Sequence, residues 1–194
     1  MTSTQASIIA NATGQLQVAR MGLKDFSGND PARRIAGFRN AVVFGRAVTN
    51  VLEHLRSKVP DFDAWYKPRS AALGSDHGFS TLYTLRSQIL KEGTGDPSVS
   101  IHIQSLNTAD LRPLMQNPPA GAESFFFGDQ TGGSGWTILN PDGESEKYYV
   151  TLPSTVQISS SHHIGEEVAV DLLARYLEAM ATLITDAKSH FGIQ

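Results

Sequence analysis

The most constraining feature of this 194-residue sequence is a change in the spacing of its apolar side chains. Through residue 92, apolar residues recur every three or four positions, which is typical of amphipathic α-helices. In residues 98–106 and 147–152 they alternate with period two, and between these segments they form short apolar runs, both of which are typical of β-strands. Helical spacing then returns and continues to residue 191. The pattern predicts an α+β fold in which a small antiparallel β-sheet is inserted before the C-terminal helix of a helical bundle.

We expect four or five helices in the bundle and three or four strands in the sheet. The expected parts of a single domain, 1–194, are a helical part (5–92), the inserted sheet (98–153) and a C-terminal helix (164–191) that packs back on the bundle. Asp30 and Pro31 favour the start of the second helix, which should extend to about residue 58. The NPDG turn at 140–143 predicts a β-hairpin, and the Pro-rich stretch 111–122 is expected to be a loop.

Composition limits the chemistry that this chain can perform. It has no cysteine, which excludes disulfides and thiolate chemistry, and no segment with the length of a membrane span, so we expect a cytoplasmic protein without a membrane partner. The net charge is −3, but residues 1–92 carry +5 and residues 93–194 carry −8. The basic half would suit a phosphate backbone, or the two halves attract each other within the fold or across a dimer.

The stretch 79–93 places an arginine among helical apolar residues. Arg86 follows Leu82 by four positions and precedes Ile89 by three, so it points towards the same face. A guanidinium group does not lose its charge, and burial therefore requires a partner. We expect Arg86 to be buried and paired with a carboxylate or with backbone carbonyls.

A second polar group lies on the predicted second helix. Arg39, Arg46, Asn50 and Glu53 fall within a sector of about 60° when each residue advances by about 100°. They form either a solvated face or, together with Arg86, a polar ligand-binding pocket between two packed helices. In the second case Glu53 would compensate one of the guanidinium groups.

The aromatic cluster of Phe62, Trp65 and Tyr66 lies beside Lys67 and Arg69. Such aromatics either stack on nucleic-acid bases or hold a short helix against the bundle, and three aromatics within five residues favour the second role. Pro68 is expected to kink or end this helix.

Two further motifs have weaker support. The Gly-rich segment 128–136 lacks the Lys-Ser or Lys-Thr and the following helix of a phosphate-binding loop, so we interpret it as a hairpin connection. His162 and His163, followed by Glu166 and Glu167, have no recognised metal-ligand spacing. We expect neither a metal nor another cofactor.

Several segments resemble an uncharacterised bacterial protein family of the same layout. These segments are FRNAVVFGRAVTNVLEHLR, FDAWYKPR, LRSQILKEG, FFFGDQTGGSGW and EKYYVTLP. The helical part is, more remotely, similar to HEPN-type bundles. That resemblance implies a metal-independent ribonuclease or a nucleotide- or partner-binding module, often dimeric and belonging to a stress, toxin or defence system.

The HEPN motif is an Arg followed by a polar residue, with a His a few residues later on the same helix. Arg86 and Ser87 match its start, but Lys91 stands where the His is expected. The resemblance implies that the His transfers a proton, whereas a lysine ammonium is a poor general base at neutral pH. We therefore expect a non-catalytic binding or interaction module, homodimeric, with a protein partner or weak RNA binding. The alternative is a ribonuclease with an altered motif that uses Arg86, Ser87 and Lys91.

Overall fold

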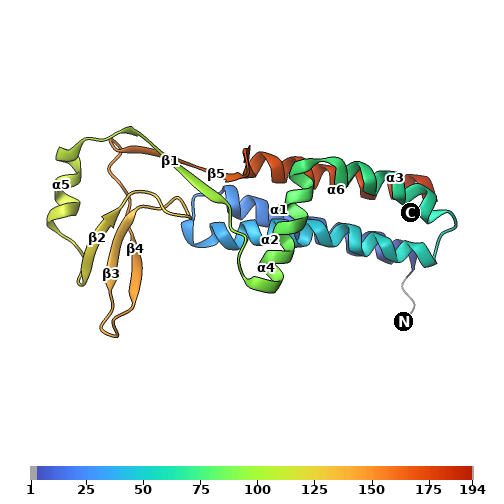
Figure 1. Cartoon of the computed structure of the whole chain (residues 1–194), viewed down its shortest axis with the longest axis horizontal. Helices are drawn as coiled ribbons and strands as arrows, with labels where there is room; N and C mark the ends of the chain where they lie inside the picture. Colours follow the sequence, from blue (N-terminus) through green and yellow to red (C-terminus); the bar gives the residue numbers. More distant parts are fainter. Residues whose placement is uncertain (1–3, 194) are drawn as a thin grey trace. The chain divides into compact units, whose positions relative to one another are not determined.

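The computed structural model describes residues 4–193, and its chain divides into two compact units (Figure 1). The helical unit comprises residues 4–96 and 164–193, and the β unit comprises residues 97–163. The predicted α+β composition is confirmed, since helices form both ends of the described chain and strands lie between them.

Within the described residues, the helical unit contains five α-helices, in line with the four or five expected, and one 3-10 helix. These are α1 (Gln5–Ser27), α2 (Pro31–Leu52), the 3-10 helix η1 (Glu53–Ser57), α3 (Phe62–Ser75), α4 (His77–Glu92) and α6 (Ala169–Phe191). The Asp30 side chain accepts a hydrogen bond from the Ala32 amide at 3.0 Å and so caps α2. Gly93 ends α4 in the left-handed conformation, with φ of 69°, as its sequence position indicates.

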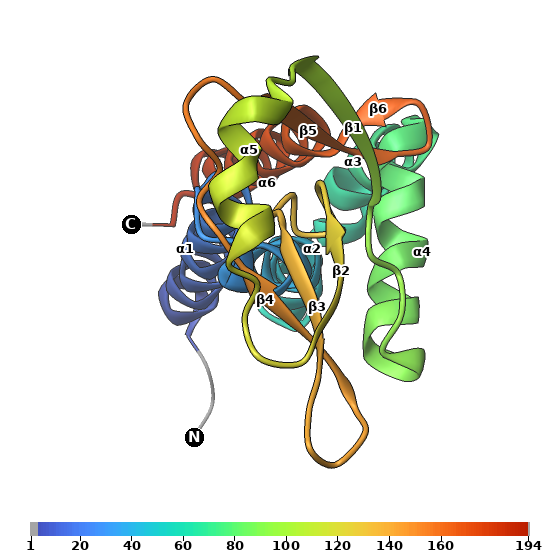
Figure 2. The same ribbon diagram turned by 90° about the vertical axis from the view of Figure 1, so that its left-hand side faces the viewer.

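Two glycines bring α1 and α2 into close backbone contact. A Cβ atom on Gly22 would lie 2.6 Å from the amide nitrogen of Ala41, and one on Gly37 would lie 2.6 Å from the amide nitrogen of Phe26. Both positions therefore require glycine at the observed helix separation. The two helices form an antiparallel pair, and viewed along the bundle α1 and α4 lie on opposite sides of α2 (Figure 2).

Helix α6 packs on α1 and α2 and completes an apolar core. Its Leu172, Leu173 and Met180 are fully buried, and Phe38 of α2 is equally inaccessible to solvent. Three ion pairs join the basic first half of the chain to the acidic second half: Arg20 with Glu178, Arg39 with Asp96, and Arg69 with Asp186. These pairs support the interpretation that the halves attract each other within the fold.

The β unit contains two antiparallel sheets and one helix. Its elements are β1 (Ser98–Ser105), α5 (Thr108–Gln116), β2 (Ala122–Phe126), β3 (Gly135–Leu139), β4 (Ser145–Tyr149) and β5 (Gln157–Ile164). Strands β2, β3 and β4 form one sheet in sequence order, and the predicted hairpin at the NPDG turn joins β3 to β4. β1 pairs with β5 in the other sheet, with Ser98 opposite His163 and Ile103 opposite Ile158.

Asp129 organises the Gly-rich connection between β2 and β3. Its Oδ1 atom accepts hydrogen bonds from the amide and hydroxyl of Thr131 and from the Gly133 amide. Its Oδ2 atom accepts from the Lys147 ammonium at 2.7 Å and from the Tyr149 hydroxyl at 2.8 Å. Burial raises the pKa of Asp129, but the hydrogen bonds from Lys147, Thr131 and Tyr149 outweigh burial and lower it from 3.8 to about 2.

The prediction of a loop at 111–122 was wrong because local chemistry overrode the pattern. The Pro-rich loop contains α5, which begins where the Asn107 side chain accepts a hydrogen bond from the Ala109 amide at 3.0 Å. Pro113 lies inside α5, and Pro68 lies inside α3 without ending it. Each proline lacks the amide that would bond one turn back, but the remaining bonds and the packing of the helix suffice.

The boundary of the insertion also needs correction. The stretch 157–164, which was not predicted to be a strand, forms β5, so the sheets extend past residue 153. Helix α6 consequently begins at Ala169 rather than at residue 164, and the two-residue strand β6 (Glu167–Val168) directly precedes it. The cause is backbone pairing with β1, which does not require the Ser- and His-rich strand to be apolar.

Candidate functional site

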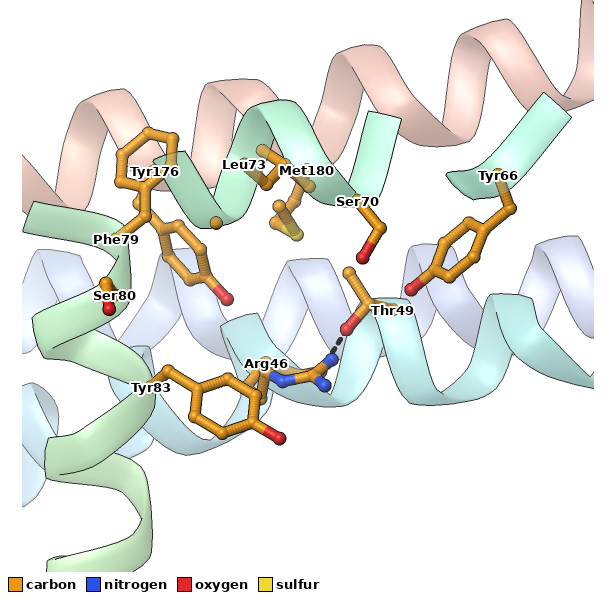
Figure 3. A pocket seen from close by; sticks show the side chains of 11 residues that line it. Arg46, Thr49, Tyr66, Ser70, Leu73, Phe79, Ser80, Tyr83, Tyr176 and Met180 are labelled. Carbon is orange, nitrogen blue, oxygen red and sulfur yellow. Dashed lines mark hydrogen bonds between the residues drawn. The ribbon is translucent and has the colours of Figure 1, made fainter. Parts of the chain in front are cut away.

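A cavity of about 180 Å³ opens among four helices of the helical unit (Figure 3). Helix α2 supplies Arg46 and Thr49 to its wall, and α6 supplies Tyr176 and Met180. The remaining wall comes from α3 (Tyr66, Ser70, Leu73, Gly74) and α4 (Phe79, Ser80, Tyr83). The site thus combines apolar and aromatic side chains with a few polar groups, which is the usual composition of a ligand pocket.

Arg46 is the one charged side chain in this wall. It is half-buried, and its Cζ atom lies 4.6 Å from the ring centre of Tyr83, which gives a cation–π contact. Within residues 4–193 no carboxylate oxygen lies within 4.0 Å of its guanidinium, and that group has no hydrogen bond. The Thr49 hydroxyl donates to the Arg46 backbone carbonyl oxygen at 3.0 Å. This hydrogen bond therefore involves the backbone of Arg46 and not its guanidinium group.

Tyr176 contributes a second donor without an acceptor. Its side chain is only 5% exposed, and within the described part of the chain its hydroxyl makes no hydrogen bond. Burial raises the pKa of Tyr176 to about 12, although the nearby charge of Arg46 opposes the rise. The phenol is therefore protonated at neutral pH and able to donate. Figure 3 shows its hydroxyl turned towards the same space as Arg46.

Tyr66 lines the cavity and binds Glu53, which lies outside the cavity wall. The Tyr66 hydroxyl donates to Glu53 Oε1 at 3.1 Å. Burial and the Glu53 carboxylate raise the pKa of Tyr66, and the Arg46 charge opposes the shift. The other Glu53 oxygen lies 3.7 Å from Arg56, so the guanidinium that Glu53 compensates is that of Arg56, outside the predicted polar line.

The structure brings only part of the predicted polar line to the cavity. Arg46 lines it, and Glu53 reaches it through Tyr66. Arg39 instead binds Asp96 through two nitrogens, at 2.8 and 3.1 Å, and Asn50 is exposed. The predicted convergence therefore fails because α2 places successive members of the line about one helical turn or more apart, where each meets a different neighbour.

The three residues of the HEPN-like motif lie outside the cavity wall. Arg86 is half-buried, and its Nε atom is buried without a hydrogen-bond partner. The ion pairs within residues 4–193 do not include Arg86, so the predicted carboxylate or carbonyl partner is wrong. Only Nε is shielded because α4 flanks the bundle, and the end of the guanidinium stays hydrated. Ser87 donates to the Tyr83 carbonyl at 3.5 Å, and Lys91 is exposed.

The aromatic cluster serves the core. Phe62, Trp65 and Tyr66 are buried, as the favoured interpretation predicts. The Trp65 indole donates to Asp186 at 3.1 Å, and Arg69 pairs with the same carboxylate. Hydrogen bonding to Arg69 lowers the pKa of Asp186 despite some burial. These rings are therefore unavailable for stacking on bases.

The histidines of β5 have separate partners. His162 is buried with Nε2 2.8 Å from the Gln130 carbonyl, and His163 Nε2 lies 2.8 Å from the Ser161 hydroxyl. In residues 4–193 no group of three or more His, Asp or Glu side chains is arranged to hold a metal ion. None of the helices formed by these residues is long and apolar enough to cross a membrane.

Sequence reasoning missed Tyr176, Tyr83 and Met180 as site residues. Tyr176 and Met180 lie in the apolar stripe of the last helix, where spacing alone indicates core. A buried tyrosine hydroxyl in such a stripe needs a hydrogen-bond partner. This need was the one indication in the sequence that Tyr176 could belong to a site. The cavity itself depends on contacts between helices far apart in sequence.

Comparison with known proteins leaves the family open. No protein-family model matches the sequence, and no curated protein or solved structure matches it either. The case for function therefore rests on the geometry of the cavity.

Proposed function

We propose that the protein is a non-catalytic binding module whose helical unit holds a small anionic ligand in the Arg46 cavity. The observation that carries the proposal is the presence of two hydrogen-bond donors without acceptors, the Arg46 guanidinium and the Tyr176 hydroxyl, in the wall of one cavity. A single anion in the cavity could accept hydrogen bonds from both groups, and the guanidinium would also supply the opposite charge.

The cavity wall also supports this choice over a purely structural role. Arg39 and Arg69 have carboxylate partners, whereas in the described residues Arg46 has no carboxylate within 4.0 Å and lies over the ring of Tyr83. The ring shields one face of the guanidinium and leaves its N–H edge for an incoming acceptor.

The experiment is a titration of the ¹⁵N-labelled protein with acetate and with inorganic phosphate at constant ionic strength. We expect saturable movement of the Arg46 Nε–H resonance, and its loss together with anion binding in Arg46→Gln. Arg20→Gln is the matched control, because it removes the same charge from an exposed pair with Glu178. Absence of saturable changes around the cavity with every anion would refute the proposal.

We also propose the more specific properties that the resemblance to HEPN-type bundles implies. The helical unit is HEPN-like, and the protein acts as a cytoplasmic homodimer with a protein partner in a stress, toxin or defence system. Sedimentation at tens of micromolar tests the dimer, because a mass of 21.0 kDa would correspond to the monomer. Two-hybrid or co-purification experiments with neighbouring gene products test the partner.

A second candidate is a metal-independent ribonuclease that uses Arg86, Ser87 and Lys91. One observation favours it: the buried Nε of Arg86 has no acceptor within the described residues, and a phosphate would supply one. Against it, no histidine occurs from residue 78 to residue 101 to transfer a proton. Under our proposal, purified protein leaves structured RNA intact in EDTA and binds it weakly with a steep salt dependence. Cleavage that disappears in Arg86→Ala would reverse the ranking.

A further inference from the structure

The Arg46 cavity limits its ligand by size, charge and the chemistry of its walls, and these limits go beyond the presence of an anion. A cavity of about 150 Å³ suffices for benzene, and the one here measures about 180 Å³. It therefore accommodates one six-membered ring with a small substituent. Pockets that enclose ligands of drug size measure roughly 300–1,000 Å³, so this cavity is too small to enclose a nucleotide.

The charge of the wall selects a monoanion. Arg46 is its single ionised side chain, and one guanidinium neutralises one negative charge. A phosphate dianion would keep an uncompensated charge in a half-buried site, close to the Glu53 carboxylate that Tyr66 binds. A carboxylate also matches the guanidinium geometry, because two parallel N–H groups can donate to its two oxygens.

The apolar part of the wall suits a planar ring. Leu73 and Phe79 are half-buried, and the rings of Phe79 and Tyr176 meet edge to face with centroids 5.1 Å apart. Leu73 lies with Met180 on the wall facing Arg46 (Figure 3). A flat aromatic body would contact these side chains while its anionic substituent reaches Arg46 and the Tyr176 hydroxyl.

We propose that the ligand of this cavity is a single-ring aromatic carboxylate, bound with its carboxylate at Arg46 and Tyr176 and its ring against Leu73 and Phe79. This inference rests on the proposed anion-binding function and specifies its ligand. It predicts that neither the aromatic ring nor the negative charge of the ligand is sufficient alone for tight binding.

Isothermal titration calorimetry at constant ionic strength tests the inference with sodium benzoate as the probe. Benzamide keeps the ring and shape without the charge, and acetate keeps the charge without the ring. We expect benzoate to bind at least tenfold more tightly than either. We also expect Tyr176→Phe to weaken benzoate binding several-fold and Arg46→Gln to abolish it, while Arg20→Gln binds as the wild type does. Circular dichroism of each variant checks the fold, and the comparison of the three ligands needs only the wild-type protein.

The outcomes separate this inference from the function on which it rests. If acetate or phosphate binds at Arg46 as tightly as benzoate, the aromatic inference is wrong and the anion-binding function stands. If benzamide binds as tightly as benzoate, the cavity recognises the ring alone, and both proposals fail. If no anion binds, the proposed function falls and the inference falls with it.

Discussion

The helical unit and the β unit are held together by different means. The helical unit buries a continuous apolar core, to which every one of its α-helices contributes. In the described β unit, the buried apolar side chains are Pro97, Leu111, Trp136 and Val156, and the carboxylate of Asp129 accepts hydrogen bonds from two segments, the β2–β3 connection and β4. The comparison teaches that a unit with little apolar core can gain order from one buried, fully satisfied polar group.

This difference predicts which kind of mutation destabilises each unit most. Loss of core volume should matter most in the helical unit, because hydrophobic stabilisation there is spread over many side chains. Loss of the Asp129 charge should matter most in the β unit, because this carboxylate accepts the hydrogen bonds that hold the Gly-rich connection between β2 and β3.

The largest expected effect is that of Phe38→Ala in the helical unit. Phe38 is 0% exposed and contacts the ring of Phe26 with centroids 5.2 Å apart. Its truncation leaves a cavity and should lower the free energy of unfolding by about 3–5 kcal/mol. Urea denaturation followed by circular dichroism at 222 nm measures the loss. Met21→Ala is the control, since that side chain is 66% exposed and should change stability by less than about 0.5 kcal/mol. Equal losses in the two variants would contradict the apolar-core account.

Asp129→Asn should have the next largest effect, and it should act on the β unit. The asparagine amide cannot accept from all five donors, and it leaves the Lys147 ammonium without its partner. We expect a loss of about 2–3 kcal/mol in the protection of β3 and β4 amides from hydrogen exchange. Asp142→Asn, in the exposed turn between these strands, should leave protection unchanged. Unchanged protection in Asp129→Asn would show that the polar hub does not stabilise the unit.

Acidification should reproduce part of this effect without a mutation. The pKa of Asp129 is lowered in the folded protein from 3.8 to about 2, so the unfolded state binds the proton first. The contribution, about 2 kcal/mol, is complete above pH 3.8 and is lost as the pH falls towards 2. Amide protection of β3 and β4 between pH 5 and pH 2 measures it. In Asp129→Asn this component of the acid sensitivity should be absent, and its persistence would assign it to another carboxylate.

The smallest expected effects are those of alanine substitutions at two glycines of α1, and the two changes in stability should have opposite signs. A Cβ on Gly14 meets nothing within 4 Å, so Gly14→Ala should raise stability by about 0.5–1 kcal/mol through helix propensity. Gly22→Ala gains the same propensity but forces α1 away from α2, with a net loss of about 1 kcal/mol. Thermal denaturation of the two variants tests this, and a stabilised Gly22→Ala would mean that the close helix contact is not needed.

The accuracy of sequence-based prediction also differs between the units. Helical spacing located the helices of the helical unit, because an amphipathic stripe records burial directly, and Gly93 marked the end of α4. In the β unit, the NPDG turn located the β3–β4 hairpin. β5 was not predicted because its side chains are largely serine and histidine. α5 was not predicted because Pro113 and the prolines that follow the helix indicate a loop.

Site residues were harder to predict than elements. Arg46 was recognised by its place on α2, but the same reasoning gave Arg86 a partner that the structure lacks. Spacing on one helix fixes the direction of a side chain but not what the neighbouring helix presents to it. The role of Tyr176 likewise depends on α2 and α6 meeting across more than a hundred residues of sequence.

The antiparallel pairing of β1 with β5 has a consequence for how this chain completes its bundle. Ser98 and His163 are cross-strand neighbours, so the two ends of the long insertion lie about 5 Å apart. A flexible segment of that length would impose a closure entropy on the order of 4 kcal/mol when the final helix docks. Once β1 and β5 have paired, that entropy has already been lost locally, and α6 joins the bundle as if it followed a tight turn. A change in the length of the insertion between the paired ends would therefore leave the closure that α6 requires unchanged.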